Sequence, residues 1–266
     1  MNLLVLTDFS ASAYDALAFA VQLFRAQPAQ FHLVHLCNPK DIYGGPDADQ
    51  TDMELRVLAM MDDLVKKIQA EFPETGHRFE GLCEKQAFLT GVKEQIKDKN
   101  INLLVMGQKG AGAREGLSVG SHAYEVATRI KKPLLLIPEG VLFQEAGSLA
   151  FSTDYNFHFK KGLLDELAQL QDLSNAHLRI IHPSSSGAGL SAVQQANKDH
   201  IASYVKDRFH SFHAVECDSL SEGLQQITKE YPVGLLLFPA KNVDYFEALA
   251  TSKAAPWQMP VVLLHD

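Results

Sequence analysis

The chain has 266 residues, of which 46% are hydrophobic and 21% charged, and its 24 Lys and Arg against 32 Asp and Glu give a formal net charge of −8. This composition is typical of a folded globular protein and excludes a disordered chain. The acidic balance argues against nucleic acid as a partner, although backbone N–H groups can still hold a small anion on an acidic protein. Because no apolar run approaches the ~20 residues of a membrane span, we expect a cytoplasmic protein without membrane contacts.

Short apolar runs alternate with longer amphipathic segments along the first 140 residues. The expected strands are 2–6, 31–37, 77–83, 103–106 and 134–137. The expected helices run from Ser12, capped by a box formed with Asp15, to Phe24, and then over 53–72, 87–97 and 121–130. Strands that alternate with helices in this way predict a parallel, doubly wound α/β sheet with helices on both faces.

The second half of the chain repeats the first. Asp154 follows Asp8 at a distance of 146 residues, His182 follows His35 at 147, and Pro260 follows Pro133 at only 127. The shrinking offset implies that the second copy lacks about fifteen residues before its fourth strand and about five after it. A helix near 220–227 is expected to begin with a capping box of Ser219 and Glu222. The repeat predicts two domains, 1–140 and 148–266.

Two residue types that often form sites point to none here. The cysteines are Cys37, Cys83 and Cys217, which are far apart in sequence and odd in number. We therefore expect reduced, buried thiols rather than a disulfide framework or a zinc motif. Among the eleven histidines, His32 and His35, like His210 and His213, are three residues apart. In a strand such a pair faces opposite sides, so no metal site is predicted.

A glycine-rich segment follows the fourth strand. It places Gly107, Gly110, Gly120 and Ser121 in the pattern Gly-x2-Gly-x9-Gly-Ser, directly before a helix. Glycine permits positive φ and lets a backbone approach a ligand closely. N–H groups of the loop and of the helix N-terminus favour an anion there, and the carboxyl end of a central parallel strand is where open α/β sheets bind ligands. The segment matches neither a P-loop nor a dinucleotide fingerprint.

This segment resembles the ATP-binding motif of the universal stress protein family. The strand ending in Met106-Gly107 and the Lys131-Lys132-Pro133 sequence before the last strand are similar to that family as well. The resemblance covers the whole chain as two copies, whereas the motif occurs in the first copy alone. It implies two tandem Rossmann-like, five-stranded parallel sheets, with ATP, with or without Mg²⁺, bound to the first.

The resemblance also implies a role for each site residue. The residues that it places around the nucleotide are Thr7, Asp8, Leu36, Met106, Gly107, Gly110, Gly120, Ser121 and His122. Thr7 and Asp8 would lie near the ribose and adenine, and Leu36 and Met106 would flank the base. Gly107 and Gly110 would pass close to the ribose and phosphates. Gly120, Ser121 and the N–H of His122 would hold the phosphates.

Several of these positions have a plainer interpretation. His122 departs from the Val or Thr that the family often has after the serine. Asp8 would instead cap the first helix, and Ser121 is expected to be a helix N-cap in any case. Lys109 and Arg114 would either screen phosphate charge or be ordinary surface charges.

The second copy is not expected to bind nucleotide. Its loop from Pro239 to Pro260 has no glycine, is five residues shorter than the segment from Gly107 to Pro133, and carries Asp244 and Glu247. These carboxylates would repel phosphate.

We therefore expect a regulatory, stress-response protein that binds an adenine nucleotide and an unknown protein partner. The alternatives are a slow ATPase of the same fold and an interaction module whose glycine loop is structural. No catalytic residue is predicted, because the sequence offers no positioned general base or arginine finger. The resemblance further implies that the last strands, 134–137 and 261–264, pair within one chain as a pseudo-dimer. Whether whole chains form a homodimer is left open.

Overall fold

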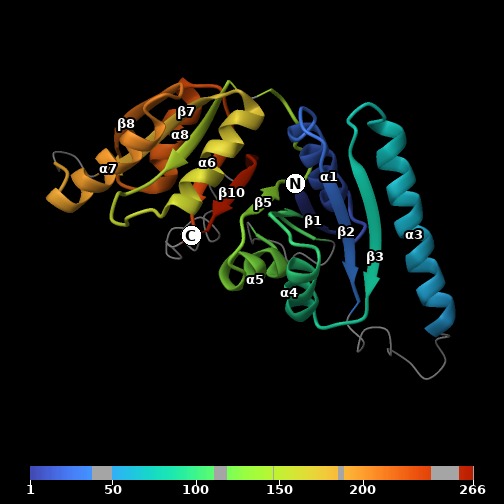
Figure 1. Cartoon of the computed structure of the whole chain (residues 1–266). Helices are drawn as coiled ribbons and strands as arrows, with labels where there is room; N and C mark the ends of the chain where they lie inside the picture. The colour runs from blue at the N-terminus through green and yellow to red at the C-terminus, as the bar shows by residue number, and fades with distance from the viewer. Residues whose placement is uncertain (38–49, 111–118, 146, 185–188, 241–257, 266) are drawn as a thin grey trace. The chain divides into compact units, whose positions relative to one another are not determined.

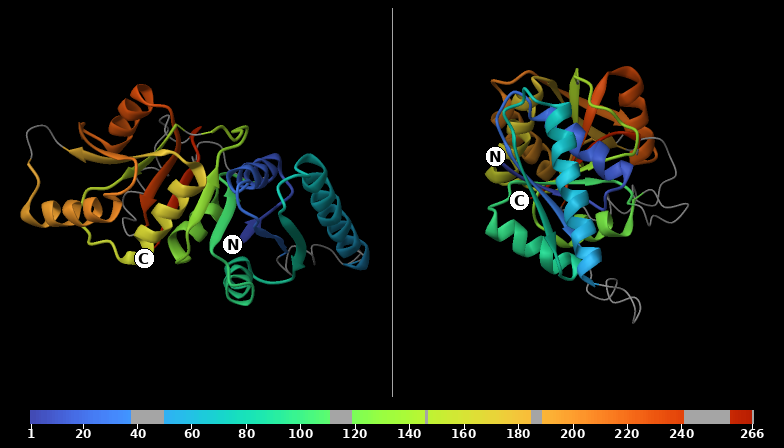
Figure 2. Two further views of the ribbon diagram at one scale, coloured as in Figure 1. Left: turned by 45° about the horizontal axis from the view of Figure 1, so that its top comes forward. Right: turned by 90° about the vertical axis from the view of Figure 1, so that its right-hand side faces the viewer.

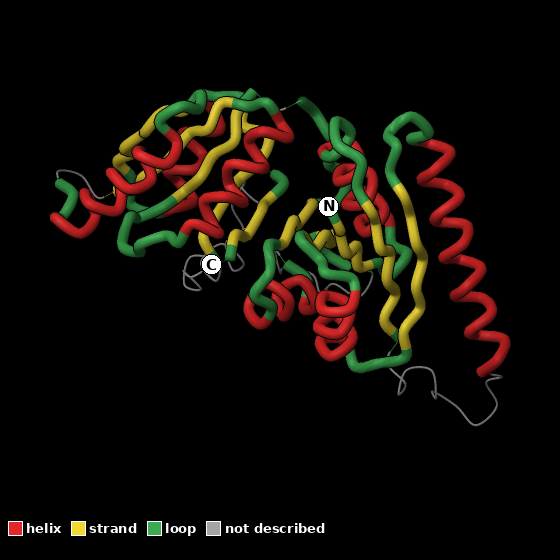
Figure 3. Tube along the Cα trace, viewed as in Figure 1, coloured by secondary structure: helices red, strands yellow, loops and turns green. Residues whose placement is uncertain are grey.

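The computed structural model describes residues 1–37, 50–110, 119–145, 147–184, 189–240 and 258–265. These residues form two compact units, the first within 1–143 and the second within 144–266. Each unit is an α/β fold in which helices alternate with strands (Figures 1 and 3).

The first unit contains five strands and four helices among its described residues. Its elements are β1 (Asn2–Leu6), α1 (Ala11–Leu23), β2 (Gln30–Leu36), α3 (Gln50–Glu71), β3 (Arg78–Glu84), α4 (Phe88–Asp98), β4 (Leu103–Gly107), α5 (Ser121–Arg129) and β5 (Leu134–Ile137). The strands are parallel in the order β3-β2-β1-β4-β5. Because the connections from β1 outward and from β3 back to β4 run in opposite directions, α1 and α4 lie on opposite faces of the sheet (Figure 2).

The second unit has the same topology. Its elements are β6 (Ser148–Ser152), α6 (Lys161–Ser174), β7 (His177–Ser184), α7 (Ala192–Val205), β8 (His210–Glu216), α8 (Leu220–Glu230), β9 (Val233–Pro239) and β10 (Val261–Leu264). The parallel order β8-β7-β6-β9-β10 matches that of the first unit strand for strand. The doubly wound α/β fold and its tandem repeat are therefore confirmed. The pairing of the two halves through their last strands stays a prediction.

Equivalent hydrogen bonds confirm the offsets of the repeat. The Thr7 N–H donates to the carbonyl of Val34, and the Thr153 N–H donates to that of Ile181. Before the last strand of each unit, the Leu104 N–H donates to the carbonyl of Pro133, and the Leu236 N–H donates to the carbonyl of Pro260. Equivalent hydrogen bonds are therefore 146–147 residues apart near the start of the two units, and the offset is shorter near their ends, as the sequence predicted.

The strands that carry the site are almost wholly apolar. Leu3, Leu4 and Val5 of β1 are fully buried, and so are Leu104 and Val105 of β4. Continuous apolar strands of this kind are covered on both faces, and their burial fixes the register that positions the loops at their carboxyl ends. Within the described ranges, no helix is both long enough and apolar enough to cross a membrane.

The start of α1 corrects the sequence prediction. The N-cap is Ser10, whose hydroxyl accepts a hydrogen bond from the Ala13 N–H at 3.2 Å. Ser12 lies inside the helix and is buried, so the predicted box of Ser12 and Asp15 is wrong. At α8 the Ser219 hydroxyl does accept from the Glu222 N–H, as predicted, while the Glu222 carboxylate accepts from the Asp218 N–H.

Candidate functional site

A tight turn follows β1 and begins the site. The Thr7 hydroxyl accepts from the Phe9 N–H at 3.0 Å, and Asp8 Oδ1 accepts from both the N–H and the hydroxyl of Ser10. Phe9 has a left-handed φ of 62°, which is strained for a bulky residue. Asp8 therefore supports the residue that caps α1 without capping the helix itself, and its side chain is exposed.

The second unit contains the same turn. The Thr153 hydroxyl accepts from the Tyr155 N–H at 3.0 Å, Asp154 Oδ1 accepts from the Asn156 N–H at 3.0 Å, and Tyr155 has φ 57°. In both units the aromatic ring packs at a tilt against a histidine of the next strand, His35 or His182. The Thr-Asp-aromatic turn therefore belongs to the fold of each unit, whether or not a ligand motif accompanies it.

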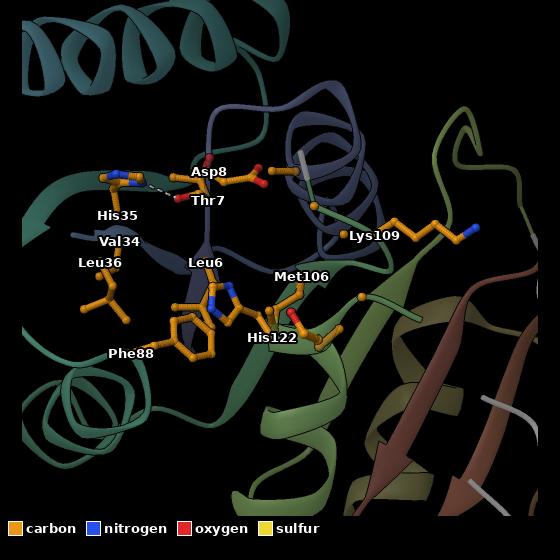
Figure 4. Close-up of a pocket in the computed structure, with 16 residues that line it drawn as sticks. Leu6, Thr7, Asp8, Val34, His35, Leu36, Phe88, Met106, Lys109 and His122 are labelled. Atoms are coloured by element: carbon orange, nitrogen blue, oxygen red, sulfur yellow. Dashed lines mark hydrogen bonds between the residues drawn. The ribbon is translucent and has the colours of Figure 1, made fainter. Parts of the chain in front are cut away.

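All nine residues predicted around the nucleotide line one pocket of about 340 Å³ (Figure 4). The pocket lies at the carboxyl ends of β1, β2 and β4, and the N-terminus of α5 borders it. Ligand pockets in proteins commonly occupy roughly 300–1,000 Å³. The structure thus brings together residues that are up to 115 positions apart, from Thr7 to His122.

Close packing requires glycine at position 107, and Gly110 and Gly120 also lie against neighbouring residues. A Cβ at Gly107 would lie 2.4 Å from the Ser12 hydroxyl and 2.9 Å from the Ser12 backbone, and a Cβ at Gly110 would lie 2.6 Å from an Asp8 carboxylate oxygen. Gly120 packs against the backbone of residues 108–110, and its N–H donates to Gln108 at 2.8 Å. None of the three has a positive φ, so close approach of the backbone, and not left-handed conformation, distinguishes these positions.

Helix α5 presents its N-terminus to the pocket. The N-cap is Gly120, which has no side chain to accept from the first turn, and Ser121 is already the first helical residue. The prediction that Ser121 is the N-cap is therefore wrong, and its exposed hydroxyl lies in the pocket wall. The first N–H groups of a helix have no partner within the helix and attract negative charge.

An aromatic pair closes one side of the pocket. The rings of Phe88, at the start of α4, and His122 are stacked with centroids 4.0 Å apart and planes at 19° (Figure 4). Phe88 is not among the residues predicted around the nucleotide. Its contact with His122 depends on where α4 and α5 lie over the sheet, which no local pattern reveals.

The remaining wall is apolar with a few polar groups. Leu36 and Met106 are joined by Leu6 and Val34, and the exposed Lys109 borders the loop. Leu6, Val34 and His35 were not predicted as site residues. Their positions beside Thr7 and Leu36 in the strands could have indicated them. His35 Nδ1 pairs with the Thr7 carbonyl at 2.8 Å, which ties β2 to the turn.

Three residues named in the sequence interpretation, Arg114, Asp244 and Glu247, lie outside the described residues. In the described part of the chain no group of three or more His, Cys, Asp or Glu side chains is placed to hold a metal ion. His32 instead pairs with Glu80, at 2.7 Å, and Lys99 contacts the same carboxylate at 3.0 Å.

Comparison with known proteins finds a matching family and solved structures with the same architecture. The model of the universal stress protein family matches residues 1–138. A crystal structure of a universal stress protein from Archaeoglobus fulgidus DSM 4304 is 15% identical, with a TM-score of 0.71, over 98% of this chain and 97% of that one. The cytoplasmic domain of a prokaryotic cation chloride cotransporter is 11% identical, with a TM-score of 0.59, over 100% and 95%. Both show the fold of the whole chain as a tandem pair.

One solved universal stress protein is a complex with cAMP; it is 22% identical over 53% of this chain and 98% of its own, with a TM-score of 0.39. The search of curated proteins finds no match to the sequence.

Proposed function

Because this chain belongs to the universal stress protein family, we propose that its first domain, residues 1–140, binds ATP in the pocket between β1, β2, β4 and α5 and serves a regulatory role in the stress response. The observation that carries this proposal is the convergence of all nine residues implied by the resemblance on one pocket of about 340 Å³. The partner that reads the bound state is a protein still to be identified.

The pocket suits an adenine nucleotide at both of its ends. Leu6, Val34, Leu36 and Met106 offer an apolar surface for a base, and the α5 N-terminus with Ser121 offers donors to phosphate. The positive charge of Lys109 adds to the attraction for phosphate at this end. Asp8 is the one carboxylate among the residues that line the pocket, so a Mg²⁺ ion would take most of its oxygen ligands from the phosphates.

The proposal assigns one bound nucleotide to the first domain and none to the second, residues 148–266. It includes a cytoplasmic location, with which the three free thiols agree. No residue of the described site is assigned a catalytic role, so binding is not expected to lead to rapid hydrolysis.

The duplicated turn provides the test, because Asp8 and Asp154 make equivalent backbone contacts. Replacing either by alanine removes an acceptor for the N–H two residues later. We expect Asp8→Ala and Asp154→Ala to lower thermal stability by similar amounts. Only Asp8→Ala should weaken ATP binding, measured by isothermal titration calorimetry.

Three outcomes decide among the functional classes. Absence of ATP binding by the wild-type protein at millimolar nucleotide would overturn the proposal and favour the interaction module. Equal loss of affinity in the two variants would mean that the turn acts only through folding. Steady phosphate release, abolished in Asp8→Ala, would identify a slow ATPase.

A further inference from the structure

Two of the three thiols lie against each other beside the pocket. Cys37 follows the last residue of β2, and Cys83 lies in β3, the neighbouring parallel strand. The register pairs His35 with Cys83, and the Cys37 N–H donates to the Glu84 carbonyl at 2.9 Å. Since strand side chains alternate between faces, Cys37 shares the face of His35 and Cys83, and the two Sγ atoms are 3.7 Å apart.

We propose that Cys37 and Cys83 form a reversible intrachain disulfide when a hydroperoxide oxidises the protein, and that this bond weakens nucleotide binding. Both thiols are free but, contrary to the sequence prediction, only partly buried, so a small oxidant can reach them. Cys217 lies in the second unit, where its Sγ contacts the Val215 carbonyl, and it serves as the unpaired control. The effect on binding rests on the proposed function, whereas formation of the bond does not.

The oxidation proceeds in two balanced steps. The Cys37 sulfur attacks the O–O bond of a hydroperoxide and becomes a sulfenic acid, and the second peroxide oxygen leaves as water or alcohol. The Cys83 sulfur then attacks the Cys37 sulfur, the S–O bond breaks, and hydroxide leaves with the Cys83 proton as water. Burial and the adjacent Cys37 raise the pKa of Cys83 to about 12, so Cys83 reacts slowly with peroxide, and its Sγ, 3.7 Å from that of Cys37, is placed for the second step. A dithiol reductant reverses the bond by exchange.

Closing the bond moves a wall of the pocket. The Sγ atoms must approach from 3.7 Å to about 2.05 Å, which draws the end of β2 toward β3. Leu36, next to Cys37, lines the pocket opposite Met106 of β4. Because β3 and β4 lie on opposite sides of β2 in the sheet order, this movement carries Leu36 away from Met106. The apolar surface offered to a base then becomes wider and less complementary.

Peptide mapping without reduction tests the bond itself. After hydrogen peroxide treatment of the folded protein, mass spectrometry should find a Cys37–Cys83 linked peptide that dithiothreitol removes, and Cys217 outside any such link. The preference for this pair should disappear when oxidation is carried out in denaturing urea. Recovery of Cys37 and Cys83 only as thiols or higher oxyacids in the folded protein would overturn the proposal, as would preferential linkage through Cys217.

Calorimetry with ATP tests the effect on the pocket. The oxidised wild type should bind with a Kd several-fold higher than the reduced protein, whereas peroxide-treated Cys83→Ser should keep the Kd of its reduced form. An unchanged Kd in a protein that carries the disulfide would refute the coupling. If the reduced protein binds no ATP at all, the proposed function fails, and the mapping result still decides whether the bond forms.

Discussion

At Gly107 the polypeptide leaves strand β4 in direct contact with the first turn of α1. A Cβ there would lie within 2.9 Å of the Ser12 backbone, and backbone cannot move aside as the end of a side chain can. We expect Gly107→Ala to lower the free energy of unfolding by roughly 1–3 kcal/mol, the usual cost of overpacking, in urea titrations.

Gly162→Ala is the matched control, because a Cβ at Gly162 would meet nothing within 4 Å. It should leave stability unchanged or raise it slightly, since alanine favours helix over glycine. If the two variants unfold at the same urea concentration, the contact with Ser12 does not limit position 107.

The motif glycines also show what sequence reasoning can reach at this scale. The resemblance of their segment to a family motif implied nine residues around a nucleotide, and all nine line the pocket. The sequence could not show why glycine is required at Gly107, because the atoms that exclude a side chain there belong to a helix 95 positions away. Local cap signals failed similarly at Ser12 and Ser121, where the preceding turn decides the helix start.

Among the secondary-structure elements, His77 ties α1 to the start of β3. Its Nε2 pairs with the Val21 carbonyl at 3.0 Å, and Nδ1 accepts from the Ala29 N–H at 3.1 Å. Burial lowers the pKa of His77, and a protonated ring could no longer accept at Nδ1. The neutral ring therefore stabilises the fold fully above about pH 6.5, the ordinary value for histidine. This contribution is lost as the pH falls through the lowered folded pKa, because the unfolded chain takes up the proton first.

We therefore expect His77→Gln to destabilise the protein at pH 7.5 and to differ less from wild type at pH 5, in urea unfolding across this range. His177 and His213 have lowered pKa values as well, from burial and from Arg179, and they titrate equally in both proteins. A wild-type-to-variant difference that is constant with pH would contradict this account of His77.

The sequence predicted which segments are helices and which are strands, because apolar runs and amphipathic periods are local features. It did not predict which side chains of different elements touch. Cys37 and Cys83 are 46 residues apart, and their adjacency depends on the β2–β3 register. The stacking of Phe88 on His122 depends likewise on how α4 and α5, which carry these rings, are placed in the folded unit.

For the whole chain, the internal offsets predicted two copies of one fold, and the identical strand orders confirm it. The two units differ where the second lost chain length, about fifteen residues before its fourth strand and about five after it. We expect calorimetry to find one ATP bound per chain, because the second unit keeps the Thr153-Asp154 turn but has no glycine from 239 to 260. Two equivalent sites per chain would show that the turn, rather than the glycine segment, suffices for binding.

The uncapped start of α5 has an energetic consequence of its own. A side-chain cap stabilises a helix by about 0.5–2 kcal/mol, and Gly120 forgoes this. A phosphate that accepts from the first-turn N–H groups would supply the missing cap. Ligand affinity and helix order would then be two measures of one equilibrium, so amide hydrogen exchange in α5 should slow as ATP is added. The nine residues of this short helix would thereby convert occupancy of the pocket into a change of local rigidity that a partner protein can sense.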